Sequence, residues 1–140
     1  NIGGKPILWH IMKNYSSYSV AKIGLTKMVE YLDAEDYEIK YSIVGPGWVD
    51  TKIHEQTIKS QNNSGSNLER TKLFLKNREN GTSFNDIYEC INWIDSKSKS
   101  IVGGRNFSVV WDSWGNRVGA NELENDLMNN IDLYKFRRVE

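Results

Sequence analysis

The chain alternates between segments with a helical pattern and segments with a strand pattern, and this alternation strongly restricts its fold. Residues 16–35 contain no proline and carry apolar side chains at spacings of three and four, which predicts an amphipathic helix. Ser16 or Ser17 is the expected N-cap of that helix. Residues 39–44 are rich in β-branched and aromatic side chains and end at Gly-Pro-Gly, which predicts a strand that runs into a turn.

The same alternation repeats further along the chain. A second helix is expected from Ser83, a candidate N-cap with Asp86 three residues later, to about Ser96. Residues 107–111 then predict a second strand, and residues 1–4 are interpreted as the end of an earlier one. Strands separated by helices are typical of βαβ units, so the expected fold is α/β with a doubly wound parallel sheet.

Two further segments lie outside this pattern. Residues 61–67 carry no apolar side chain and predict an insertion, with a short helix over 68–76 beyond it. A last helix is expected over about 122–130, in an otherwise polar C-terminal tail.

Charge and cysteine content exclude several classes of protein. The 18 Lys and Arg residues balance the 18 Asp and Glu residues, so no global field favours nucleic acid or an anionic membrane as a partner. No apolar stretch reaches the roughly 18 residues that a membrane span needs. Cys90 is the single cysteine and the chain has two histidines, which argues against a disulfide framework or a metal site and favours the cytoplasm. Cys90 lies on the apolar stripe of its predicted helix and is interpreted as a buried, unreactive thiol.

Tyr18 and Lys22 are the pair of residues with the clearest chemical potential. They stand four apart in the first predicted helix, so their side chains lie on one face. A lysine ammonium favours the ionised form of a neighbouring phenol and lowers the pKa of that phenol, which makes it a usable general acid or base. In open α/β sheets ligands bind beyond the carboxyl ends of the strands, where the turn at 46–51 is expected.

In their order and spacing, these motifs resemble the short-chain dehydrogenase/reductase family. The match consists of Asn-Ile-Gly-Gly at 1–4, Tyr-x-x-x-Lys at Tyr18 and Lys22, Pro-Gly-x-Val-x-Thr at 46–51, and a helix, Gly-Gly-Arg and a strand over 83–110. The resemblance implies that residues 1–111 are the second half of a Rossmann-like NAD(P)-binding domain. Within it residues 48–80 would form the loop over the substrate, and residues 112–140 would be a C-terminal tail extension.

The resemblance also implies an activity, the interconversion of an alcohol and a carbonyl with NAD or NADP as cofactor. Tyr18 would be the general acid or base, and Lys22 would favour its phenolate and bind the nicotinamide ribose. The cofactor-binding site would also include four residues of the turn after the first strand: Pro46, Gly47, Val49 and Thr51. Relatives of this kind assemble as homodimers or homotetramers, with the helix that bears Tyr18 packed against its copy.

One departure from the family pattern keeps two alternatives open. A serine that polarises the substrate carbonyl is usual where this chain has Gly3 and Gly4, and the loss of such a donor can cost about 10²–10³ in rate. The first alternative is therefore a catalytically silenced relative that binds nucleotide or acts as a scaffold. The second is a sugar-nucleotide epimerase or dehydratase, since relatives with that chemistry share the Tyr and Lys pair.

Three side chains are candidates for contact with a small alcohol or carbonyl substrate. Trp9 lies in the loop expected beside the site, and Trp48 lies inside the Pro-Gly turn, so both can supply aromatic walls. His54 follows Thr51 closely and is a candidate proton donor, with a solvated loop histidine as the competing interpretation.

Overall fold

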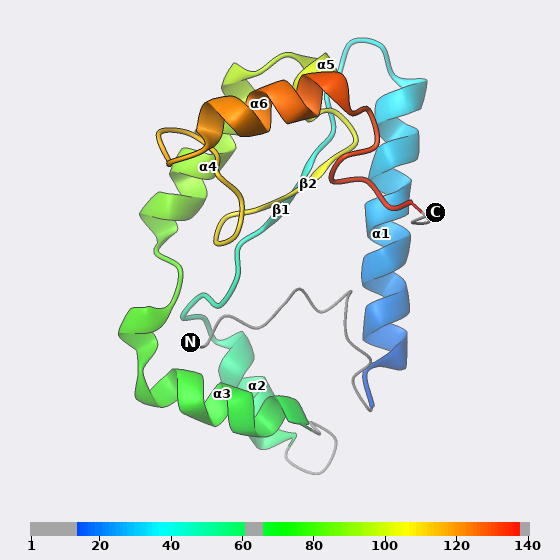
Figure 1. Cartoon of the computed structure of the whole chain (residues 1–140). Helices are drawn as coiled ribbons and strands as arrows, with labels where there is room; N and C mark the ends of the chain where they lie inside the picture. The colour runs from blue at the N-terminus through cyan, green and yellow to red at the C-terminus, as the bar shows by residue number, and fades with distance from the viewer. Residues whose placement is uncertain (1–13, 61–65, 138–140) are drawn as a thin grey trace.

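The computed structural model describes residues 14–60 and 66–137 (Figure 1). Helices and strands follow one another in the order α1 (Ser16–Glu35), β1 (Ile43–Gly45), α2 (Ile53–Lys59), α3 (Ser66–Lys76), the 3₁₀ helix η3 (Arg78–Asn80), α4 (Phe84–Ser96), α5 (Lys99–Val102), β2 (Asn106–Ser108) and α6 (Ala120–Asn129). Within this part of the chain no helix is long and apolar enough to span a bilayer.

The two strands pair in parallel, as a βαβ arrangement requires. Ile43 lies opposite Asn106, Val44 opposite Phe107, and the pairing ends at Gly45. The chain between them passes through α2, α3, α4 and α5, so β1 and β2 are joined by a long crossover connection. The described residues therefore form a mixed helix and strand structure with a small parallel sheet, which is compatible with an α/β fold.

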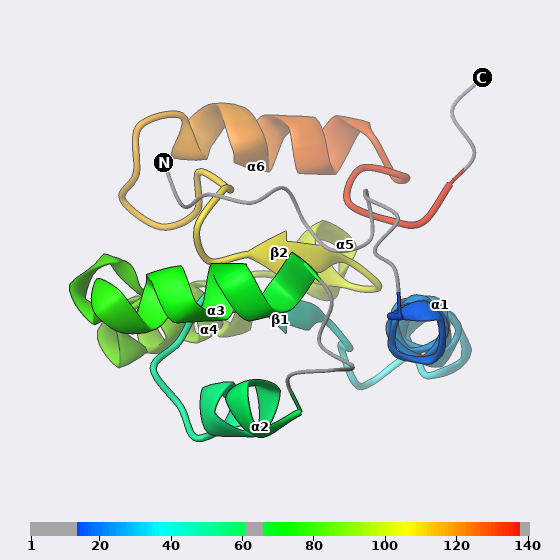
Figure 2. The ribbon, with the colours of Figure 1, turned by 90° about the horizontal axis from the view of Figure 1, so that it is seen from below.

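The hydrophobic core lies where β2 meets α4 and α6. The rings of Trp93 and Phe107 meet edge to face with centroids 5.6 Å apart. The cluster of buried apolar side chains consists of Cys90, Trp93, Ile94, Val102, Phe107, Val109, Trp114, Leu123 and Leu127. Figure 2 shows α6 on one side of the strands and α2 on the other. Burial confirms the interpretation of Cys90, and it raises the pKa of this thiol to about 11, so the thiolate needed for nucleophilic chemistry is disfavoured.

The helix predicted over 16–35 is confirmed as α1, with the same bounds, but its cap is not the predicted one. Tyr15 occupies the N-cap position and no side chain caps the first turn, so the prediction of Ser16 or Ser17 is wrong. The face of α1 that packs against the protein carries Thr26 and Glu30, which are its buried residues. Part of its apolar stripe faces outward instead, as at Val20 and Met28, which are 69% and 52% exposed, while Ile23, Val29 and Leu32 are half-buried.

Both strands are shorter than predicted, because backbone amides next to them donate hydrogen bonds to side chains instead of to a neighbouring strand. The amide of Tyr41 donates to Asp33 Oδ1 at 3.0 Å, so residues 39–42 follow α1 instead of extending β1. After β2, the hydroxyl of Ser108 accepts the amides of Val110 and Trp111 at 3.3 Å and 3.1 Å. This turn ends the strand at Ser108, and the prediction of a strand over 107–111 holds only at its start.

The second predicted helix is confirmed as α4 together with its cap. The hydroxyl of Ser83 accepts the amide of Asp86 at 3.0 Å, and the helix ends at Ser96. The helices expected over 68–76 and 122–130 correspond to α3 and α6 with small shifts of their ends. Most of the predicted insertion, residues 61–65, lies outside the described residues.

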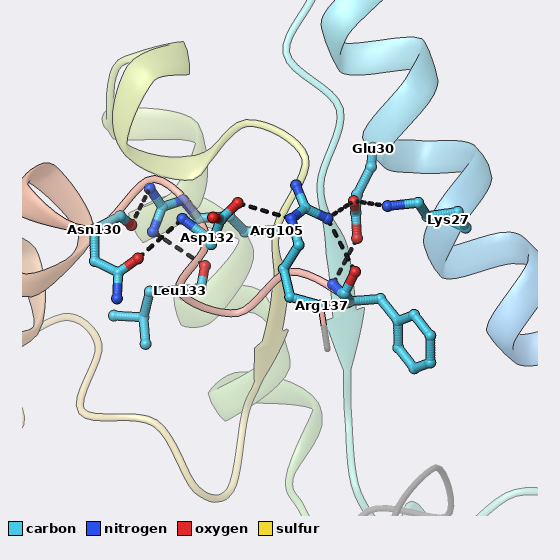
Figure 3. Close-up of polar contacts among 8 residues, drawn as sticks. Lys27, Glu30, Arg105, Asn130, Asp132, Leu133 and Arg137 are labelled. Carbon is cyan, nitrogen blue, oxygen red and sulfur yellow. Dashed lines mark hydrogen bonds and ion pairs between the residues drawn. The ribbon is translucent and has the colours of Figure 1, made fainter. Parts of the chain in front are cut away.

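Two buried ionic groups connect the C-terminal segment to the rest of the fold (Figure 3). The guanidinium of Arg105, at the start of β2, donates to the carbonyls of Leu127, Asn130 and Leu133 at 2.6 Å, 3.2 Å and 3.2 Å. On α1, Glu30 accepts the amide of Phe136 at 2.6 Å and pairs with Lys27 and Arg137. Burial opposes ionisation of Glu30, but these hydrogen bonds outweigh it and lower the pKa of the carboxyl group.

Candidate functional site

Tyr18 and Lys22 lie side by side on α1, as their spacing predicts. The ammonium of Lys22 is 5.5 Å from the centroid of the Tyr18 ring, within cation–π range, and both side chains are exposed. The ring of Tyr15 meets that of Tyr18 edge to face at 5.9 Å, which restricts its orientation. The phenol hydroxyl of Tyr18 is thus held on a helix and open to a ligand.

The pair lies at the end of the molecule where the carboxyl ends of the strands are found. In Figure 1 both strands run downwards while α1 starts at the bottom and runs upwards, so its first turns and the turn after β1 both lie in the lower half of the molecule, on opposite sides of the view. α1 is followed directly by β1 along the chain, and a helix and the next strand that are joined by a short connection run in opposite directions.

The turn after β1 depends on a glycine. Gly47 has a φ of +78°, and a Cβ there would lie 2.6 Å from a methyl carbon of Val110 and 2.8 Å from the hydroxyl of Thr82. A side chain at this position would therefore be strained and would clash with two neighbouring segments. Next to it, the amide of Thr82 donates to the carbonyl of Trp48 at 2.7 Å and fixes the turn against the start of α4. The position of Thr51, exposed at the end of this turn, is thereby constrained.

His54 is part of a buried ring cluster and is not a solvated loop residue. Its ring is stacked on Trp48 at 5.5 Å with an interplanar angle of 12°, and it lies 4.8 Å from the ring of Phe74. Its Nε2 donates to the carbonyl of Val49 at 2.8 Å. The interpretation of His54 as a solvated loop histidine is wrong, because His54 lies on α2 and is buried against Trp48 of the preceding turn and Phe74 of α3.

An open hollow of about 640 Å³ lies between the turn after β1, α2 and the end of α3, and we call it the α2–α3 hollow. Its lining consists of Asp50, Thr51, Lys52, His54, Glu55, Ile58, Lys59, Leu75 and Arg78. Two predicted site residues, Thr51 and His54, therefore line one depression, which Tyr18 and Lys22 do not line.

The remaining site predictions divide into described and undescribed residues. Trp48 lies in the ring cluster with His54, and the carbonyl of Val49 accepts the hydrogen bond from His54 Nε2. Trp9, Gly3 and Gly4 lie outside the described residues. Pro46 is exposed at the end of β1, next to Gly47.

Sequence patterns alone do not reveal the far wall of the hollow. Leu75 and Arg78 lie more than twenty residues after Thr51, and Arg78 reaches Asp50 with N–O distances of 3.1 Å and 3.0 Å. The usable signal is the apolar run at residues 73–75, which predicts a helix but not its packing against α2. Within residues 14–60 and 66–137, no three His, Cys, Asp or Glu side chains are grouped so that they could hold a metal ion.

Comparison with known proteins gives no relative: no protein-family model matches the chain, and no curated protein or solved structure is significantly similar to it.

Proposed function

We propose that this chain belongs to an NAD(P)-dependent oxidoreductase of the short-chain dehydrogenase/reductase type, which interconverts an alcohol and a carbonyl. The observation that carries the proposal is the pairing of Tyr18 with Lys22 on α1, with 5.5 Å between ammonium and ring centroid, at the end of the molecule towards which both strands run. On this proposal residues 1–111 are the second half of a doubly wound, Rossmann-like domain. The parallel pairing of β1 and β2 through a crossover supports that larger sheet.

Several described residues fit the nicotinamide end of a dinucleotide. The ammonium of Lys22 and the hydroxyl of Thr51 are both exposed, and a ribose hydroxyl or a carboxamide can bind such donors. Gly47 leaves no room for a side chain next to Val110, so the turn after β1 has a fixed course. In this arrangement Lys22 would bind the ribose, while Pro46, Gly47, Val49 and Thr51 would border the nicotinamide.

The chemistry assigned to the chain itself is proton transfer. The bound nicotinamide would supply or accept the hydride. Tyr18 would donate a proton from its hydroxyl to the carbonyl oxygen during reduction and accept it back during oxidation. Lys22 would stabilise the phenolate left behind, because a cation one helical turn away lowers the energy of that anion.

The proposal is tested by equilibrium binding of NAD(H) and NADP(H), combined with a turnover screen on small ketones, aldehydes and nucleotide sugars. We expect nucleotide binding and nucleotide-dependent reduction of at least one carbonyl class. Binding without turnover would favour the silenced scaffold, and conversion of a nucleotide sugar without net redox change would favour the epimerase or dehydratase. Failure of the complete protein to bind either nucleotide would contradict both the oxidoreductase and the epimerase or dehydratase, and would leave only a scaffold that does not bind nucleotide.

We also propose that the protein forms a homodimer or homotetramer through α1 and works in the cytoplasm. The support is the outward apolar face of α1, where Val20, Leu25, Met28 and Tyr31 are each more than 40% exposed. The single cysteine, which is buried, suits a reducing compartment.

The assembly can be measured by light scattering on the purified protein. We expect a dimer or tetramer at micromolar concentration for the native sequence and a monomer for Met28→Lys, because a lysine at the centre of an apolar contact leaves a charge without water. Glu55→Lys, an exposed change on α2, is the charge control and should keep the native mass. A native monomer would contradict the proposed assembly.

A further inference from the structure

We propose that the α2–α3 hollow binds an organic anion, a molecule with an apolar body and one carboxylate or similar acidic group. The inference rests on three properties of the hollow: its volume and apolar floor, the excess of its cations over its carboxylates, and its rigid back wall. As a statement about the substrate of the oxidoreductase it rests on the proposed function, but binding itself needs neither nucleotide nor turnover.

The volume of the hollow suits a small molecule. At about 640 Å³ it falls within the range of about 300–1,000 Å³ that is typical of ligand pockets. Ile58 from α2 and Leu75 from α3 are half-buried and form its apolar floor. A ligand with a hydrocarbon or aromatic body would remove this apolar surface from water.

The charges around the hollow leave a surplus of cations. The guanidinium of Arg78 is already paired with Asp50, since Nη1 lies 3.1 Å and 3.0 Å from the two carboxylate oxygens. Of the remaining charged groups in the lining, Lys52 and Lys59 are cations and Glu55 is the one carboxylate. The ion pairs among the described residues include none of these three groups, so an acidic ligand could bind an ammonium without displacing a carboxylate.

The back wall of the hollow is already in place before any ligand binds. His54 is only 7% exposed, and its ring is stacked on that of Trp48 and meets the ring of Phe74 at a tilt of 49°. The hydrogen bond from its Nε2 to the carbonyl of Val49 fixes the ring plane. Because these groups need no reordering, little conformational entropy is lost when a ligand packs against them.

The location of the hollow gives this binding a consequence for specificity. Thr51, which the proposed function assigns to the nicotinamide, is also part of the lining. An anion held by Lys52 or Lys59 would therefore have its apolar body directed along the floor near Thr51. On the proposed function, a carbonyl substrate that reaches from Tyr18 to this hollow, which Tyr18 itself does not line, would be favoured by an acidic group at its far end.

The inference is tested by calorimetric titration of the protein, without nucleotide and at low salt, with 4-phenylbutanoate and with the uncharged 4-phenylbutanol. We expect the carboxylate to bind about five- to tenfold more tightly than the alcohol, since partly exposed ion pairs contribute modestly and two lysines are available. Added salt should weaken binding of the carboxylate alone. Phenyl phosphate, the second arm, shows whether the site also accepts a phosphate.

The double variant Lys52→Gln and Lys59→Gln keeps the hydrocarbon stems and removes both charges. It should lower the affinity for 4-phenylbutanoate to that for the alcohol and leave the affinity for the alcohol unchanged. Lys72→Gln is the matched control, because this lysine lies on α3 outside the hollow and is paired with Glu69 at 2.9 Å. Equal affinity for the two compounds, no measurable binding of the carboxylate, or undiminished binding by the double variant would overturn the inference. Since no nucleotide is present, these results are independent of whether the protein is an oxidoreductase.

Discussion

Replacement of Tyr18 by phenylalanine should reduce turnover at least about a hundredfold while nucleotide still binds, because general acid catalysis contributes about 10²–10⁴ in rate. The change removes one hydroxyl and keeps the ring, so the contacts with Tyr15 and with the ammonium of Lys22 remain. The expected loss therefore falls on kcat and leaves the dissociation constant of NAD(P)H nearly unchanged.

Two further tyrosines provide matched controls for this variant. Tyr15→Phe removes a hydroxyl from the ring in contact with Tyr18, and Tyr31→Phe removes one further along the same helix. Both should keep near-native turnover. Lys22→Met should weaken nucleotide binding as well as turnover, because Lys22 is assigned to the ribose. Near-native turnover by Tyr18→Phe would exclude Tyr18 as the acid.

Replacement of Arg105 by methionine should lower the free energy of unfolding by about 3 kcal/mol, which is the largest stability effect we expect from a single change. Arg105 is 2% exposed, and its guanidinium donates to carbonyls at the end of α6 and in the segment after it. Burial lowers the pKa of this guanidinium, so removal of the charge offsets part of the loss. The carbonyls of Leu127 and Asn130 would nevertheless lose their charged donor, and Leu127 lies within the buried core.

Urea denaturation measures this effect, with Arg70→Met as control. Arg70 is exposed on α3, so the same change there should alter the free energy of unfolding by less than about 0.5 kcal/mol. Arg105→Lys should be intermediate, since an ammonium cannot reach all of the carbonyls that the guanidinium serves. Equal denaturation midpoints for Arg105→Met and the native protein would show that the buried guanidinium does not hold the C-terminal segment.

Helix positions could be predicted because their signals are local. The spacing of apolar residues and the absence of proline fix α1, and the Ser83 side chain that caps α4 lies three residues from the amide it binds. The length of β1 could not be predicted, because it depends on a side chain of the preceding helix. The carboxylate of Asp33 on α1 accepts a hydrogen bond from the amide of Tyr41. The pattern of residues 39–44 alone does not predict this hydrogen bond.

The face of α1 that packs against the protein also could not be predicted from the spacing of its apolar residues. Its apolar stripe predicts a face turned to the core, yet the buried positions are Thr26 and Glu30. Glu30 is tied to residues 136 and 137 of the C-terminal segment, more than a hundred positions away. Ionic contacts of this kind select the packed face, and a pattern of hydrophobicity does not encode them.

The candidate site was only partly accessible from the sequence. The Tyr18 and Lys22 pair follows from helical spacing alone. The α2–α3 hollow depends instead on the packing of Phe74 and Leu75 against the turn after β1. This packing buries the side chain of His54, which the sequence predicts to lie in a loop. Such contacts between segments twenty residues apart require the tertiary structure.

Transfer of deuterium from a dihydronicotinamide that carries two deuterium atoms on its reactive carbon, so that either face transfers label, tests the central claim most directly. The protein is incubated with labelled NADH or NADPH and a set of carbonyl compounds that includes acidic ones, and the products are analysed by mass spectrometry. We predict an alcohol that carries one deuterium on the carbon bearing the hydroxyl group, with one nucleotide oxidised per product and almost none formed by Tyr18→Phe. Nucleotide that binds but retains its label with every carbonyl, or label transfer that persists in Tyr18→Phe, would contradict the account.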